Sequence, residues 1–81
     1  MGERKGYKKV SNYQRILIQT VIEEGSRVAA AEKLGINLRT LENGLYRAFK
    51  ALKVGNISDA FYLISNGIFS REEMQEKYTV P

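Results

Sequence analysis

The chain contains neither cysteine nor histidine. Without cysteine there is no disulfide framework and no thiolate metal site. Without histidine, zinc fingers, zinc enzymes and histidine-based catalytic triads are excluded as well. The carboxylates are scattered along the sequence and form no catalytic constellation. We therefore expect neither enzymatic activity nor a bound metal or cofactor.

Long apolar runs are also missing, and the longest is far too short to span a bilayer. The N-terminal end is basic but lacks the apolar segment that follows it in a secretion signal. We therefore expect a cytoplasmic protein with no membrane partner. The 81 residues have room for one domain with a modest core, because chains of this size bury only about 60% of their unfolded surface.

The net charge of +4 is concentrated at the N-terminal end. Residues 1–15 contain five basic residues and one acidic residue, whereas the rest contains eight of each and is neutral. A basic arm on a neutral body suits phosphate binding, although such arms also serve as solubilising tails. Residues 1–10 show no apolar periodicity, so we expect them to form a flexible arm.

The first predicted helix begins with a capping box. The Ser11 hydroxyl and the Gln14 side chain are spaced to cover orphan amides at its start, and we expect the helix to run to about Glu24. Ile18 and Ile22 widen its apolar face beyond the need of a surface helix, so it should be covered on more than one side. The expected core-facing residues are Tyr13, Ile16, Leu17, Thr20 and Val21.

Two further helices are joined by a tight turn. Ser26 is placed to cap a helix over Arg27–Leu34, Gly35 to end it, and Asn37 to cap a helix over Leu38–Leu52. Apolar residues on both sides of the turn are spaced to share one small core between steeply crossed helices: Ala31, Leu34, Ile36 and Leu41. This spacing is typical of a helix-turn-helix, whose second helix enters a DNA major groove.

The Leu38–Leu52 helix has one apolar and one polar face. Its apolar residues recur at intervals of three and four: Leu38, Leu41, Leu45, Ala48 and Leu52. The residues left facing outward are Arg39, Thr40, Glu42, Asn43, Tyr46, Arg47 and Lys50. Gly44 lowers helix propensity by about 1 kcal/mol relative to alanine. Such a residue suggests a close approach by either the DNA backbone or the Arg27–Leu34 helix, and packing against the Ala29–Ala31 patch is the first candidate.

A fourth helix is predicted over residues 59–66, with Ser58 as its cap and Gly67 after its end. Its consecutive apolar residues, which cannot all face one core, are Phe61, Tyr62, Leu63 and Ile64. A second capping box at Ser70 predicts a short terminal helix that reaches Lys77 and is an alternative cover for the surplus face. No strand pattern or repeat is visible. The sequence therefore predicts an all-α bundle of four to five helices, with a domain over residues 11–67 and a turn and short helix over 68–81.

A gapless pattern covers most of these elements. Its matching residues are Ala31, Leu34, Ile36, Asn37, Thr40, Leu41, Leu52, Val54, Ser58 and Ala60. This pattern resembles that of the LuxR/GerE-type DNA-binding domain, over residues 10–67. Gly44 stands where the family usually has histidine, Glu42 where a basic residue often faces DNA, and Ala51 where a lysine usually contacts phosphate.

The resemblance implies a homodimer on two-fold symmetric double-stranded DNA, with residues 38–52 in the major groove. The expected DNA contacts are Lys8, Lys9, Arg39, Thr40, Glu42, Asn43, Tyr46, Arg47 and Lys50. Among them Asn43 has the carboxamide that pairs with adenine. Thr40 either binds a phosphate or supplements the helix cap. Tyr46 either contacts DNA or covers Tyr13 and Leu17. The basic residues either anchor phosphates or are merely solvated. The expected dimer contacts are Phe61, Leu63 and Ile64.

Together these patterns predict a sequence-specific DNA-binding transcriptional regulator. The alternative is a helix-turn-helix interaction module that binds another regulator or RNA polymerase without binding DNA. The neutral body favours this alternative, as does Glu42, whose carboxylate either accepts a hydrogen bond from cytosine or repels phosphate.

Overall fold

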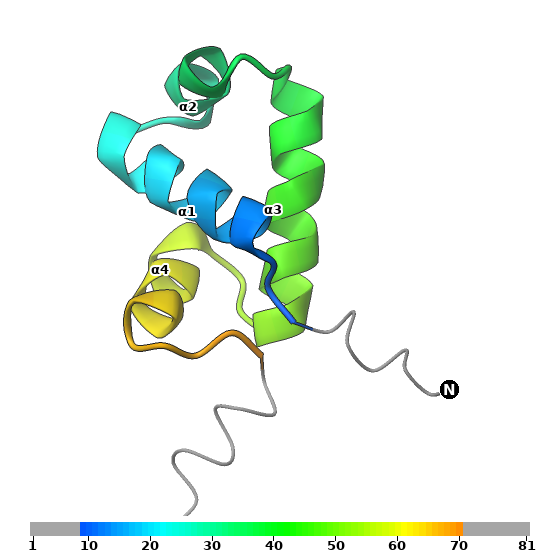
Figure 1. Ribbon diagram of the computed structural model, residues 1–81, viewed down its shortest axis with the longest axis vertical. Coiled ribbons are helices and arrows are strands. Elements are labelled where there is room, and N and C mark those ends of the chain that lie inside the picture. The colour runs from blue at the N-terminus through cyan, green and yellow to red at the C-terminus, as the bar shows by residue number, and fades with distance from the viewer. Residues whose placement is uncertain (1–8, 71–81) are drawn as a thin grey trace, which may run out of the picture.

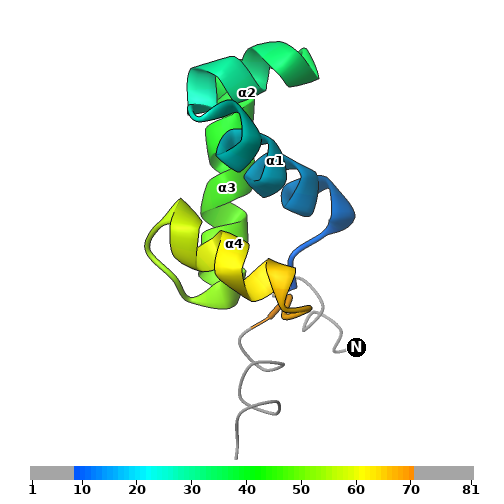
Figure 2. The same ribbon diagram turned by 90° about the vertical axis from the view of Figure 1, so that its left-hand side faces the viewer.

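Four helices and no strand make up the part of the chain that the computed structural model describes, residues 9–70 (Figure 1). They are α1 (Asn12–Glu24), α2 (Arg27–Leu34), α3 (Leu38–Leu52) and α4 (Ile57–Ser65). The longest helix, α3, packs against each of the other three, and α1 also contacts α2 and α4. Figures 1 and 2 show α2 lying across the N-terminal end of α3. The all-helical prediction is confirmed for this range.

Local hydrogen bonds at the caps set the helix ends. The Ser11–Gln14 capping box is present, Ser26 Oγ accepts from the Ala29 N–H at 3.1 Å, and Asn37 Oδ1 accepts from the Thr40 N–H at 2.8 Å. All three caps are the residues predicted from the sequence, and the predicted bounds of α1, α2 and α3 are confirmed.

The predicted start of α4 is wrong by two residues. Asn56, not Ser58, caps the helix, and its Oδ1 accepts from the Asp59 N–H at 2.8 Å. The Asn56 amide also donates to Asp59 Oδ2 at 3.2 Å. This reciprocal pair gives Asn56 the stronger cap, so α4 begins at Ile57.

The core lies where α1, α3 and α4 meet. Its largest fully buried side chains are Leu17, Ile18, Leu41, Leu45, Leu52 and Ile68. Tyr13 and Ile16, which we expected to face the core, are 48% and 47% exposed. Because α1 packs against all three other helices, its buried face is turned toward Ile18. Leu38, the first residue of α3, is also exposed.

The two ends of the described range are held together. The Val10 N–H donates to the Phe69 carbonyl at 2.7 Å, and the Arg15 guanidinium lies 5.0 Å from the centroid of the Phe69 ring. Val10, expected in the flexible arm, is buried in the core, as is Ile68, expected beyond the domain. Both therefore belong to the folded domain. The rest of the arm, residues 1–8, and the predicted terminal helix after Ser70 lie outside the described residues.

Gly44 marks the closest approach of α3 to α1. A Cβ atom at this position would overlap Leu17 Cδ1 and lie 4.0 Å from Tyr13 Cε2. The expected contact with the Ala29–Ala31 patch is therefore wrong, because Gly44 faces α1 rather than α2. Leu17 is fully buried and cannot swing into solvent to make room.

We expect Gly44→Ala to destabilise the domain even though alanine is the better helix former. Overpacking costs about 1–3 kcal/mol and the gain in helix propensity is about 1 kcal/mol, so the net loss should be as much as about 2 kcal/mol. Urea unfolding measures it. Asn43→Ala, an exposed neighbour on α3, is the control and should be at least as stable as wild type.

The packing explanation can be tested separately by removing the obstructing end of the Leu17 side chain. In a Leu17→Ala background, Gly44→Ala should stabilise, because the space is then open and only the propensity term remains. If the substitution lowers stability equally in both backgrounds, the contact with Leu17 is not the cause.

Candidate nucleic-acid interface

The outward face of α3 is exposed to solvent. All seven α3 residues predicted to contact DNA are exposed: Arg39, Thr40, Glu42, Asn43, Tyr46, Arg47 and Lys50. The opposite face is buried, because Leu41, Gly44 and Leu45 turn toward the core. Arg39, Asn43, Tyr46 and Lys50 follow one another at intervals of four, three and four residues, so their side chains line up along the helix.

Formal charge within residues 9–70 is distributed unevenly among the helices. Four basic residues and one acidic residue lie on α3 and its C-cap, which gives +3: Arg39, Glu42, Arg47, Lys50 and Lys53. Elsewhere in this range four basic residues balance four acidic ones: Lys9, Arg15, Glu23, Glu24, Arg27, Glu32, Lys33 and Asp59. The net positive charge of residues 9–70 is therefore carried by α3 and its C-cap.

The one acidic residue on this face has a basic neighbour. Glu42 Oε2 lies 3.8 Å from Arg27 Nη1 of α2, and both side chains are about half exposed. An exposed pair of this kind contributes little to stability. It does place a positive charge beside the carboxylate that would otherwise repel phosphate.

At the N-terminal end of α3, the cap leaves Thr40 accessible. Asn37 Oδ1 accepts a hydrogen bond from the Thr40 backbone N–H, while the Thr40 side chain is exposed. Asn43, one turn further along, is exposed as well. The two residues can therefore reach a molecule that lies along α3 without disturbing the cap.

Tyr46 is held by a neighbour on its own helix. Its side chain is 62% exposed, and the Lys50 ammonium lies 5.4 Å from the centroid of its ring. This is within the range of a cation–π interaction. The phenol ring is therefore largely exposed on the outward face of α3.

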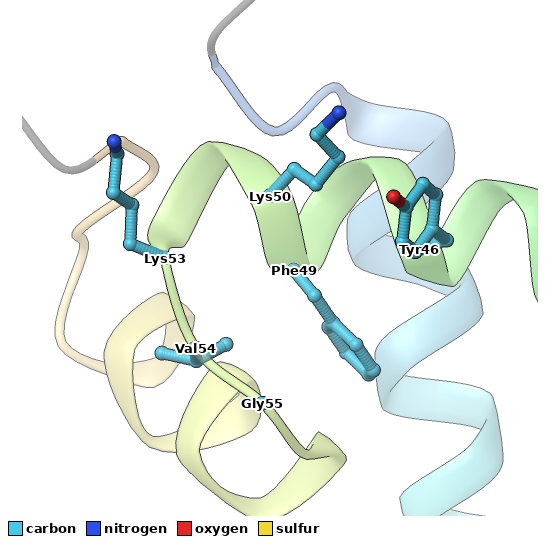
Figure 3. Close-up of a pocket in the computed structure, with 6 residues that line it drawn as sticks. All are labelled: Tyr46, Phe49, Lys50, Lys53, Val54 and Gly55. Carbon is cyan, nitrogen blue, oxygen red and sulfur yellow. The ribbon is translucent and has the colours of Figure 1, made fainter.

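A cleft of about 450 Å³ lies at the C-terminal end of α3 (Figure 3). Its lining residues are Tyr46, Phe49, Lys50, Lys53, Val54 and Gly55. The sequence reasoning missed Lys53, which ends α3 in the left-handed conformation with φ +57°. The only signal for Lys53 in the sequence was its position directly after the predicted helix. The cleft itself forms because the chain turns toward α4 at this point.

The residues predicted for a dimer contact are mostly covered. Leu63 and Ile64 are buried, at 7% and 6% exposed, and Phe61 is half-buried. The expectation that Leu63 or Ile64 lies in an exposed patch is wrong, because α4 packs against both α1 and α3. Tyr62, at 62% exposed, is the large apolar residue that α4 presents to solvent.

Other predicted features can be placed only in part. Lys9 is exposed, and Lys8 lies outside the described residues. Within residues 9–70, no three carboxylates come together as metal ligands would. None of the helices in that range has both the length and the apolar character to cross a membrane.

The chain was also compared with known proteins. Neither the protein-family models, nor the curated proteins, nor the solved structures gave a match. The function must therefore be inferred from the α3 face.

Proposed function

We propose that the chain is a sequence-specific DNA-binding transcriptional regulator in which α2, the Gly35–Asn37 turn and α3 act as a helix-turn-helix. The observation that carries this proposal is the charge of α3 and its C-cap Lys53, which together bear the whole net positive charge of residues 9–70 on an exposed face. A major groove about 12 Å wide admits one α-helix, and its phosphates attract such a face.

The residues of α3 divide between positioning and base reading. Arg39, Arg47 and Lys50 anchor phosphates, and the Thr40 hydroxyl donates to a phosphate beside the helix start. The Asn43 carboxamide pairs with adenine, and Glu42 accepts a hydrogen bond from the cytosine amino group.

We also propose that the protein binds as a homodimer. A two-fold contact through α4, with Tyr62 at its centre, would place the two copies of α3 about 34 Å apart, one turn of DNA. Each copy would then meet one half of a palindromic site. The basic arm, including Lys8 and Lys9, would follow the adjacent backbone or minor groove.

We expect Asn43→Ala and Tyr46→Ala each to weaken binding to a site selected from a random DNA pool, by about 1–3 kcal/mol. Fluorescence anisotropy with a half-site duplex measures this without the dimer contact. Tyr62→Ala is the matched control for Tyr46→Ala, since both tyrosines are 62% exposed. Gln19→Ala, exposed on α1, is the control for Asn43→Ala.

If both α3 variants keep full affinity and unchanged thermal stability, the assignment of α3 as the recognition helix is wrong. Capture of RNA polymerase or another regulator by a chain that binds no duplex would make it an interaction module instead.

Deletion of residues 1–8 should weaken binding to selected and random duplexes alike. The deletion leaves the Val10–Phe69 hydrogen bond in place and removes Arg4, Lys5 and Lys8. The salt dependence should flatten by about 0.9 in log–log slope for each lost phosphate contact. A slope equal to that of the full chain would show that the arm is a solubilising tail.

Tyr62→Glu should give a folded monomer that binds a half-site normally and a full palindromic site weakly. Leu63→Glu should instead unfold the domain, because it buries an unpaired charge. Analytical ultracentrifugation and circular dichroism separate the two results. If wild type sediments as a monomer even on a full site, the proposed dimer is wrong.

A further inference from the structure

We propose that the cleft at the C-terminal end of α3 binds the sugar–phosphate backbone of DNA at the edge of the major groove. Lys50 and Lys53 would contact the phosphate, and Phe49 and Val54 the deoxyribose. This inference rests on the proposed function and adds to it a second, sequence-independent anchor at the far end of α3.

The length of α3 brings the cleft to the groove edge. From Arg39 to Lys53 the helix rises about 21 Å, at 1.5 Å per residue, whereas the groove is about 12 Å wide. A helix whose first turns enter the major groove and cross its width would therefore carry its last turn out past a phosphate strand. The cleft lies on that last turn.

The chemistry of the cleft matches the repeating unit of a DNA strand. Phe49 and Val54 are half-buried and supply an apolar floor, while Lys50 and Lys53 are exposed. Figure 3 shows the two lysine side chains extending to one side of the cleft and Phe49 to the other. A deoxyribose has apolar carbons beside an anionic phosphate, so a backbone segment satisfies both sides at once.

The cleft is continuous with the proposed DNA-binding face, because Tyr46 and Lys50 belong to both. With α3 in a groove, DNA rather than a protein segment would cover the cleft. The backbone of Lys53 adds to this argument. Its φ of +57° lies in the region that favours glycine. A lysine there is less favourable than glycine, so the backbone conformation does not account for the choice of side chain.

Lys53→Gly in the full chain tests the proposal by moving stability and affinity in opposite directions. The melting temperature should rise, because glycine relieves the left-handed backbone. Affinity for selected and random duplexes should fall about eightfold at 0.1 M salt, the effect of one lost phosphate contact with a slope of 0.9. Lys53→Gln should show the same loss of affinity without the gain in stability.

Lys33→Gln is the matched control, because Lys33 is an exposed lysine on α2 that pairs with Glu24 at 3.3 Å. It lies away from the cleft and should bind DNA like wild type. Equal losses for Lys33→Gln and Lys53→Gln would show a general charge effect and overturn the assignment of the cleft.

Neutral methylphosphonates, introduced one at a time into the selected duplex, locate the contact. One position at the groove edge should cost wild type about eightfold and Lys53→Gly almost nothing. Additive effects at every position would overturn the proposal. So would Lys53-dependent binding of poly-glutamate to the DNA-bound protein, which would assign the cleft to an acidic protein segment.

The same measurements separate this proposal from the proposed function. If Asn43→Ala weakens DNA binding and the Lys53 variants do not, only the cleft proposal fails. If wild type binds no duplex, both fail.

Discussion

The contact between Leu17 and Gly44 fixes the arrangement of the other helices. Because Gly44 has no side chain, α1 can approach the middle of α3 closely enough to bury Leu17 completely. Helix α2 then covers the N-terminal end of α3, and α4 packs against both α1 and α3. Asn43 is turned outward as a result, whereas Leu45 lies on the same buried side as Gly44.

A consequence of this geometry is that α3 concentrates like charges on one face. Arg39, Arg47, Lys50 and Lys53 repel one another, and Glu42 offsets only one of them. Charge of one sign destabilises the compact state through self-repulsion. An anion that lies along α3 reduces this repulsion. Binding an anion there should therefore also stabilise the folded domain.

Local chemistry made α1, α2 and α3 predictable, because the Ser11, Ser26 and Asn37 caps depend only on residues three positions away. The start of α4 was missed because Asn56 and Ser58 are both good caps and lie two residues apart. The partner of Gly44 and the burial of Leu63 could not be predicted, because they depend on how whole helices pack. The polar face of α3 follows from periodicity alone, whereas the cleft at Lys53 requires the path of the chain after the helix.

The hydrogen bond between Val10 and Phe69 places the two ends of the domain side by side. A short linker could therefore join them, and the chain could be opened elsewhere, at the exposed Gly25–Ser26 connection between α1 and α2. Such a circular permutant would keep α2, α3 and α4 in their present order and would place α1 after α4. Because its two ends lie close together, the domain is also suitable for insertion into a surface loop of another protein. The two cut ends of that loop would need to move apart only slightly to accept it.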